Sequence, residues 1–181
     1  GSRSTQFWEL AGYLKHDTPA IPTSLVEPKT PGEVAAEGAA FFVASCQPTG
    51  HSLGKVLSVD TCYRTDDPDL FIRRFLARNN VDLSTVDAVM LGYNGDSRYD
   101  TIYDQLTEGC LTEKAIVGYK HVLGEFDTVS AAALFVALYV LKRNHIPEVL
   151  HVSGPVPKAL NRILVYNQRR GVNHALILVE R

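Results

Sequence analysis

Short uncharged apolar runs alternate with amphipathic stretches from about residue 36 to the end of the chain. Such runs, several of them rich in β-branched side chains, are typical of strands. We predict strands at residues 39–45, 55–63, 86–93, 114–117, 149–153, 162–166 and 174–179, and helices at 67–80, 98–107 and 126–143. Asp66 or Asp67, ahead of Pro68, can cap the first of these helices. Strands that alternate with helices predict an α/β domain with a mixed or parallel sheet.

The first 35 residues follow a different pattern. Residues 7–15 are amphipathic and predict a short helix, and residues 15–33 contain four prolines. Because proline removes a backbone donor and biases the preceding residue away from helix, we interpret 15–33 as an extended segment. Its apolar residues Ile21, Leu25 and Val26 would anchor it. The sequence therefore divides into an N-terminal part, 1–35, and an α/β part, 36–181.

The helix predicted at 126–143 has no polar face in its middle, where residues 131–141 read AAALFVALYVL. A helix that is apolar all round is buried, and a two-layer domain would leave its outer side uncovered. A membrane-surface helix is the alternative, but no basic cluster flanks it. We therefore expect another layer, from a missing half or a partner chain, and dimerisation through the surface around 131–139.

Composition narrows the class of protein. The chain has 181 residues, 45% of them hydrophobic and 21% charged, with a net charge of -2. These values predict one soluble domain with a real core, and the scattered charges predict no nucleic-acid or membrane partner. The polar first residues show no signal peptide, which favours a cytoplasmic protein. The three cysteines, Cys46, Cys62 and Cys110, are odd in number and form no metal motif. They are expected to be buried, reduced thiols.

Four segments, taken in order, resemble the second half of the β-ketoacyl-acyl-carrier-protein synthases. AEGAAFFV at 36–43 is similar to the family's Gly-Glu-Gly-Ala strand entry, and DAVMLGYNGDS at 87–97 lies where the family has a strand ending in His-Gly-Thr-Ser. KHVLG at 120–124 resembles Gly-His-Leu-Leu-Gly before the central helix, and RGVNHALIL at 170–178 resembles the closing Gly-Gly-Thr-Asn strand. The resemblance covers roughly four fifths of the chain.

The resemblance implies one half of a thiolase-like fold, whose five layers are ordered αβαβα. In this half, helices pack on a mixed five-stranded-type sheet, and the helix at 126–143 is the central buried one. The family's nucleophilic cysteine lies in the other half, and none of the three cysteines here sits at a strand-to-helix turn before an apolar helix. We therefore expect no complete condensing site in this chain.

The resemblance also implies positions for two catalytic side chains. The family's second histidine corresponds to His121, and its first corresponds to Asn94, an amide that cannot titrate near neutral pH. The family's lysine position falls near Ile116, with Lys114 close but out of register. We expect His121 and Asn94 to lie near each other at one edge of the sheet. Alternatively, His121 only caps a turn, Asn94 belongs to a plain turn, and His174 is a satisfied core histidine.

The family's glycine-rich loop is replaced by NQRRG at 167–171. Arg169 and Arg170 are candidate contacts for an acidic acyl carrier protein or its phosphopantetheine arm, or else belong to a solvated loop. No cofactor or metal is expected apart from that arm, which is a substrate.

Two functions remain open. The first is a degenerate, non-condensing partner subunit or half, similar to a chain-length factor in fatty acid or polyketide biosynthesis. The second is the C-terminal half of an active 3-oxoacyl-carrier-protein synthase, an acyltransferase. A stand-alone domain that dimerises through its helix is a third, weaker option. The first two imply an acyl carrier protein and a homologous synthase half or subunit as partners.

Overall fold

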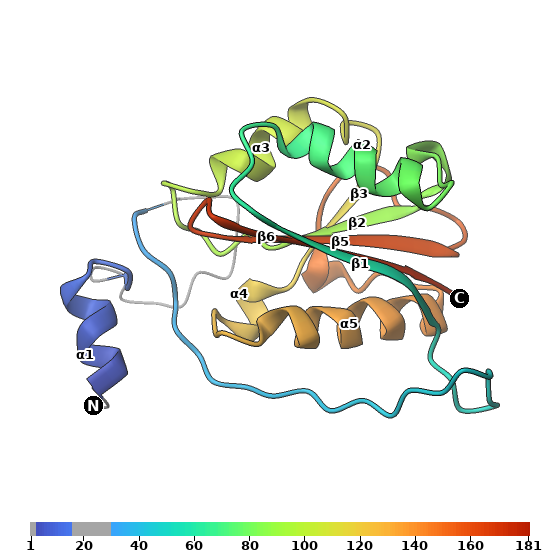
Figure 1. The fold of residues 1–181 in the computed structure, drawn as a ribbon, viewed down its shortest axis with the longest axis horizontal. Helices are drawn as coiled ribbons and strands as arrows, with labels where there is room; N and C mark the ends of the chain where they lie inside the picture. The colour runs from blue at the N-terminus through green and yellow to red at the C-terminus, as the bar shows by residue number, and fades with distance from the viewer. Residues whose placement is uncertain (1–2, 16–29) are drawn as a thin grey trace.

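The computed structural model of the chain describes residues 3–15 and 30–181. Its centre is a six-stranded sheet with the strand order β1-β6-β5-β2-β3-β4 (Figure 1). The strands are β1 (Lys55–Tyr63), β2 (Ala88–Leu91), β3 (Ala115–Gly118), β4 (His151–Ser153), β5 (Arg162–Arg169) and β6 (Asn173–Glu180). The helices are α1 (Arg3–Leu10), α2 (Pro68–Arg78), α3 (Thr101–Glu108), α4 (Lys120–Leu123) and α5 (Val129–Arg143). Short 3-10 turns, η1 (Leu83–Thr85) and η2 (Glu148–Leu150), lead into β2 and β4.

The sheet is mixed, as the sequence predicts. β2 pairs in parallel with β3 and with β5, whereas the pairs β1-β6, β5-β6 and β3-β4 are antiparallel. The helices α2 and α3 cover one face and α5 covers the other (Figure 1). The α/β class and the helices on the sheet are therefore confirmed, with six strands in place of the expected five.

The central strand β2 is buried on both faces. Ala88 and Met90 belong to the core beneath α5, and Val89 and Leu91 belong to the core beneath α2 and α3. Successive strand residues face opposite sides of a sheet, so a strand covered on both sides is apolar throughout. The uninterrupted apolar run in the sequence therefore reflects a three-layer arrangement within this chain.

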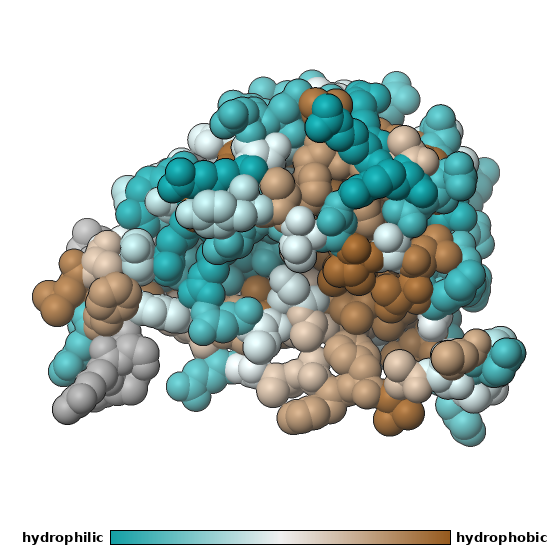
Figure 2. Space-filling model, viewed as in Figure 1, coloured by the Kyte–Doolittle hydropathy of each residue, from teal (hydrophilic) through white to brown (hydrophobic). Residues whose placement is uncertain are grey.

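The helix α5 leaves its outer side uncovered by the described residues. Val129, Ala133 and Ala137 are buried against the sheet. Phe135 and Tyr139 stack on each other with 6.1 Å between ring centroids, and they are 49% and 41% exposed. Figure 2 shows hydrophobic side chains gathered low on this face, where α5 and the segment beneath it lie. The helix thus covers the sheet and still presents an apolar surface outward.

The strand predicted at residues 39–45 is wrong, because this stretch belongs to no strand. It is extended and runs beneath α5, on the side away from the sheet (Figure 1). Phe41 and Val43 are 94% and 103% exposed. The sequence has the composition of a strand, but a strand also needs a neighbouring backbone, and the described chain offers none here.

The N-terminal helix lies earlier than predicted. The expected range was 7–15, whereas α1 spans Arg3–Leu10 and the chain turns at Gly12, whose φ of 67° is left-handed. Leu14 then forms a parallel bridge with Glu33. Most of the segment predicted to be extended, including Ile21, Leu25 and Val26, lies outside the described residues.

The three cysteines are free, and the expectation that they are buried is wrong. Cys46 is exposed, and Cys62 and Cys110 are partly exposed. Within residues 3–15 and 30–181, no helix has the length and apolar content needed to cross a bilayer.

The cap of α2 gives a test of local stability. Asp67 Oδ1 accepts a hydrogen bond of 2.8 Å from the backbone N–H of Leu70, which identifies Asp67 rather than Asp66 as the cap. We expect Asp67→Ala to lower the free energy of unfolding by about 1 kcal/mol, because that N–H loses its partner. Urea unfolding measures the change. Asp66→Ala is the matched control, and an equal loss in both variants would contradict the assignment.

Candidate functional site

The carboxyl ends of the parallel strands β2, β3 and β5 meet at one edge of the sheet. Ligand sites in such sheets form beyond these strand ends. Asn94 follows β2, Lys120 follows β3, and Arg170 follows β5. The segment 30–36 crosses the same edge, since Thr30 bridges to Asp96 and Ala35 bridges to Glu125. Four distant parts of the sequence therefore converge at this edge.

A buried ion pair lies at the centre of this edge. Lys120 Nζ is 2.5 Å from Glu125 Oε2, and the two side chains are 0% and 2% exposed. Asn94 Nδ2 donates a hydrogen bond of 3.0 Å to the same oxygen. Removing two charges from water costs several kcal/mol per ion, so such a pair persists only with close geometry and further hydrogen bonds. Asn94 supplies one of these bonds.

Glu33 brings a second buried carboxylate from the N-terminal segment. Arg170 Nη2 donates to Glu33 Oε1 at 2.7 Å, and Asn94 Nδ2 lies 3.5 Å from Glu33 Oε2. Arg170 also packs over the Tyr13 ring, 3.4 Å from its centroid. We refer to Lys120, Glu125, Asn94, Glu33 and Arg170 as the buried charge network. Two cations face two carboxylates in it, and one amide joins the carboxylates.

The surroundings of Glu33 shift the pKa of its carboxyl group. Burial raises its pKa above the usual value of 4.5, and the nearby Glu125 carboxylate raises it further. The Arg170 guanidinium opposes both effects. The net shift of the Glu33 pKa is upward, because the hydration free energy that the buried carboxylate loses is larger than the stabilisation that Arg170 provides.

The loop after β2 is held by its own polar contacts. Asp100 Oδ2 accepts a 2.8 Å bond from the N–H of Gly95, and Lys15 Nζ donates to the Gly95 carbonyl at 2.8 Å. Gly95 has a φ of 80°, a left-handed conformation that favours glycine. Asp96 binds its neighbour Arg98 with Nη2–Oδ2 at 2.6 Å. These contacts fix the backbone that carries Asn94.

The structure gives His121 a different environment from Asn94. His121 Nε2 lies 2.5 Å from the carbonyl oxygen of Val149, whereas its neighbour Lys120 points into the network. Consecutive residues on a helix point about 100° apart, so one turn of α4 cannot direct both side chains to the same place. Asn94 therefore hydrogen-bonds to Glu125 and lies near Glu33, whereas the ring of His121 meets the Val149 carbonyl. The catalytic roles that the resemblance implies for His121 and Asn94 stay predictions.

The lysine near the family position is also far from this edge. Lys114 Nζ donates to the carbonyl of Val86 at 2.8 Å, at the amino end of β2. It precedes β3, whereas Lys120 follows that strand. The sequence interpretation missed Lys120 and Glu33. Lys120 could have been identified as a candidate because it directly precedes His121 in the sequence, but no neighbouring motif indicated a role for Glu33.

The two candidate arginines are engaged within the chain. Arg170 binds Glu33, and Arg169 forms an ion pair with Asp127 while its guanidinium lies 5.3 Å from the centre of the Trp8 ring. Both side chains keep about a fifth of their surface exposed, at 23% for Arg169 and 20% for Arg170. A contact with a carrier protein stays a prediction for both.

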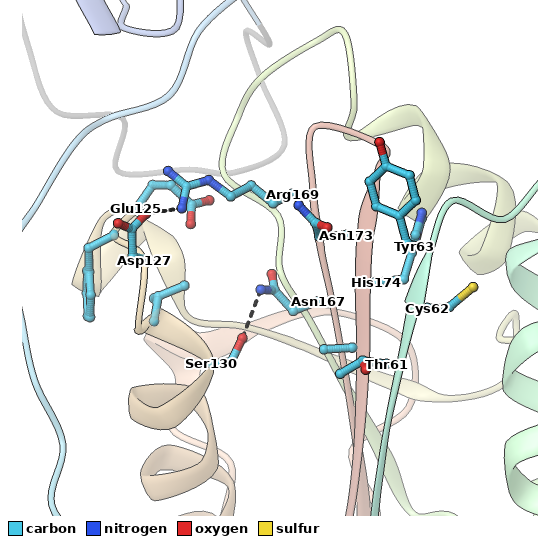
Figure 3. A pocket seen from close by; sticks show the side chains of 13 residues that line it. Thr61, Cys62, Tyr63, Glu125, Asp127, Ser130, Asn167, Arg169, Asn173 and His174 are labelled. Atoms are coloured by element: carbon cyan, nitrogen blue, oxygen red, sulfur yellow. Dashed lines mark hydrogen bonds and ion pairs between the residues drawn. The ribbon is translucent and has the colours of Figure 1, made fainter. Parts of the chain in front are cut away.

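A pocket of about 410 Å³ opens beside the network, between the start of α5 and the ends of β1, β5 and β6 (Figure 3). Asn167 from β5 donates to the Ser130 hydroxyl of α5 at 3.0 Å across it. Thr61 and Tyr63 line it from β1 and Asn173 from β6. The pocket thus presents hydroxyl, amide and guanidinium groups to a ligand.

One thiol and one imidazole, those of Cys62 and His174, line the pocket. Cys62 lines the pocket, but it lies on β1, and its Sγ is 3.1 Å from the carbonyl of Arg64. His174 is buried, as the sequence predicts. Its Nδ1 lies 2.8 Å from the Tyr166 hydroxyl, and burial lowers the pKa of its imidazole. Among the described residues, no group of His, Cys, Asp and Glu side chains is arranged to bind a metal.

The sequence matches no protein-family model and no curated protein. Among solved structures, it is similar to the ishigamide ketosynthase/chain length factor, with a TM-score of 0.69 and 15% identity. That match covers 99% of this chain and 51% of the other. It is also similar to a type II PKS acyl-carrier protein in complex with its ketosynthase bound to a hexaketide, with a TM-score of 0.72 and 14% identity. That match covers 98% of this chain and 52% of the other. A beta-ketoacyl synthase from Burkholderia phymatum STM815 matches with a TM-score of 0.54 and 14% identity, over 71% of this chain and 38% of the other.

These likenesses show the fold. The chain has the thiolase-like architecture of ketosynthases, and it spans about half the length of the first two structures that it matches. The expected half of a five-layer fold is confirmed, because one layer of helices, the sheet and the layer of α5 are present (Figure 1).

The buried ion pair can be tested by removing its cation. We expect Lys120→Met to lower the free energy of unfolding by about 3–5 kcal/mol, because Glu125 then lacks a cation in a site closed to water. Lys55→Met is the control, since Lys55 pairs with Glu180 at the surface, where such pairs contribute about 0–1 kcal/mol. Urea unfolding compares the two variants. Similar losses would mean that water screens the Lys120–Glu125 pair.

Glu33 should make stability depend on pH. Its pKa is raised in the folded state, so above about pH 4.5 the folded chain binds more protons at Glu33 than the unfolded chain does. The stability of the wild type relative to Glu33→Gln should therefore fall as pH rises through 4.5 and level off above the folded pKa. Urea unfolding of both proteins between about pH 4 and pH 8 measures this difference. A difference that rises with pH would mean that Arg170 outweighs burial.

Proposed function

We propose that the chain is a non-condensing half or subunit of a ketosynthase-like assembly, similar to a chain-length factor, in polyketide or fatty acid biosynthesis. The observation that carries this proposal is the buried charge network. It occupies the sheet edge where the resemblance places the condensing histidines. Lys120, Glu125, Glu33 and Arg170 satisfy one another there, so none of them is free to polarise a thioester.

The chemistry of condensation supports this assignment. Acyl transfer to a condensing enzyme needs an activated thiolate, and the following step needs donors aimed at the developing negative charge. The described residues place no thiol at a helix start, and His121 is engaged with a backbone carbonyl. In this proposal the chain contributes the wall of a site whose nucleophile lies on a partner.

The partners follow from the same proposal. The chain spans about half the length of the first two ketosynthase structures that it matches, which supports a homologous synthase half or subunit as its partner. A matched structure contains an acyl carrier protein with its ketosynthase, which supports a carrier protein as the second partner. Arg169, which lines the pocket, and its sequence neighbour Arg170 are the cations that such an acidic carrier would meet. A dimeric assembly in the cytoplasm belongs to this proposal as well.

The second candidate is the C-terminal half of an active 3-oxoacyl-carrier-protein synthase. The observation in its favour is His121, which corresponds to the family's second histidine and is partly exposed. In that case a partner with the cysteine would reposition His121 toward the reacting thioester. The two candidates differ in whether His121 takes part in turnover.

The purified chain should not condense substrates by itself. A malonyl carrier and an acyl thioester should give no ketoacyl product, because no thiolate is placed to take the acyl group. Mass spectrometry of the carrier-bound products measures this, with an intact condensing enzyme as the positive control. Steady turnover by the chain alone would contradict the proposal.

His121→Ala separates the two candidates once the chain is combined with its cysteine-bearing partner. A non-condensing half should keep its turnover within about twofold. An active half should lose about 10²–10⁴-fold, the usual contribution of a positioned acid or base. Val122→Ala, an exposed neighbour in α4, is the matched control.

A further inference from the structure

Two stretches that precede the α/β part, residues 8–15 and 30–34, pair with each other at the sheet edge, and we call them the strap. The N–H of Glu33 donates to the Tyr13 carbonyl at 2.8 Å, and the N–H of Lys15 donates to the Glu33 carbonyl at 3.2 Å. The strap is thus a small ladder that carries aromatic, cationic and acidic side chains together.

The strap takes no part in the hydrophobic core of the described chain. The buried hydrophobic side chains lie between positions 72 and 179, and α1, whose last residues belong to the strap, stands apart from the layers (Figure 1). Contacts such as the 2.8 Å bond from Lys15 Nζ to the Gly95 carbonyl can be replaced by bonds to water. Segments that bury few apolar contacts open at a lower free energy than the whole domain unfolds. The strap can therefore detach while the sheet stays folded.

Two arginines in the turn between β5 and β6 hold the strap on the sheet. The Arg170 guanidinium lies 3.4 Å from the centre of the Tyr13 ring and 5.9 Å from that of the Trp8 ring. The Arg169 guanidinium lies 5.3 Å from the Trp8 ring, and Arg170 also donates to Glu33 at 2.7 Å. A cation over an aromatic ring is attracted by the negative face of that ring. All of these contacts join the strap to a single turn, so they are lost together if the strap leaves.

Glu33 makes the closed strap sensitive to charge. Its side chain is 2% exposed, and the Asn94 amide lies between its carboxylate and that of Glu125. Closing the strap removes Glu33 from water and places it near a like charge, and both effects raise the pKa of Glu33. In an open strap the carboxyl group is hydrated, and its pKa returns toward the usual value. The closed strap therefore binds the proton more tightly, and ionisation of Glu33 shifts the strap toward the open state.

The other charged and titratable groups at this edge come from every element that packs around Glu33. Burial lowers the pKa of Lys15, so loss of its proton favours closure, the opposite sign to Glu33. Burial also lowers the pKa of His174, whose Nε2 lies 3.3 Å from the Gly171 carbonyl in the turn. The remaining groups are Tyr13 on the strap, Asp96, Arg98 and Asp100 after β2, Lys120 and Glu125 after β3, and Arg169 and Arg170 after β5.

We propose that the strap is a conformational switch on the turn between β5 and β6, closed over Arg169 and Arg170 when Glu33 is neutral and shifted toward an open state when Glu33 is ionised. Opening releases both guanidinium groups from the aromatic rings. Because Arg169 lines the pocket, the strap controls the cations presented there. The switch is a property of this chain by itself and holds for either of the two candidate functions.

Trp8 is the only tryptophan of the chain, so its fluorescence reports the position of the strap. In the closed strap its ring is partly covered and lies against Arg169. We expect the Stern–Volmer constant for acrylamide quenching of the full chain to rise about twofold from about pH 5 to pH 8, as the open population grows. Glu33→Gln should abolish this rise and keep quenching low. Glu37→Gln, which alters an exposed carboxylate close to the strap, is the matched control and should keep the rise.

Tyr13 tests the stacking without a change of charge. Tyr13→Ala should give high quenching of Trp8 at both pH values, because Arg170 loses the ring that it packs against. Tyr13→Phe should behave as the wild type, because the stacking needs only the ring. Far-UV circular dichroism and urea unfolding should show the domain folded in both variants, since Tyr13 lies outside the hydrophobic core.

Each contrary result removes a defined part of the proposal. A rise that persists in Glu33→Gln would assign the pH response to another group, such as His174, and overturn the role of Glu33. Low quenching in Tyr13→Ala would overturn the stacked arginines as the contact that holds the strap. Quenching of the wild type that stays low at both pH values would overturn the open state. A rise accompanied by loss of the far-UV signal would show unfolding of the domain and overturn local opening.

Discussion

Two buried carboxylates, those of Glu33 and Glu125, constrain the edge of the sheet on which the rest of the site depends. Neither can lie in a site closed to water without a cation, because an unpaired buried charge costs several kcal/mol. Lys120 meets Glu125 and Arg170 meets Glu33, so β3 and β5, which lie on either side of β2, must end at the same edge and the segment 30–36 must cross it. Asn94, an amide, can donate to both carboxylates without adding charge. The network is thus a single electrostatic unit assembled from four distant parts of the chain.

The uncovered side of α5 is the second constraint. A helix this apolar is stable in water only where its faces are covered, and the sheet covers one of them. The stacked Phe135 and Tyr139 and the extended residues 37–45 lie on the other. Both surfaces have the character of interior structure, although they are open in the described chain. They lie on the same side of the molecule, because the extended residues run along the outer side of α5 (Figure 1).

Elements set by local pattern were predictable, and those set by distant contacts were not. The strand β1, the capped helix α2 and the helix α5 follow from β-branched runs, a proline with its capping aspartate, and an apolar stretch of helical length. The strand at 39–45 failed because pairing requires a partner backbone that composition does not reveal. The position of His121 could be predicted, but whether it or Lys120 faces the site depends on the phase of one turn of α4.

The site was harder to predict than the fold for a related reason. Glu33 reaches Arg170 across 137 positions of sequence, so no local signal links them. The loop at 167–171 indicated two arginines in place of glycines, and that change does mark the site. The sequence interpretation proposed an external anion as the contact of both arginines, and the structure shows that each arginine also pairs with a carboxylate of this chain. Charges that look free in a sequence are often neutralised by residues that only folding brings near.

The closed site and the open surface meet at Glu125. Its carboxylate belongs to the buried charge network, while its backbone carbonyl receives the N–H of Ala36, the last residue before the chain becomes unpaired. The segment that closes the sheet edge therefore continues directly into the segment that lacks a sheet. In the proposed function, a partner half that packs on the outer side of α5 would lie next to a network in which every charge already has a partner. This chain would then supply a rigid wall, and the reactive groups would lie on the partner.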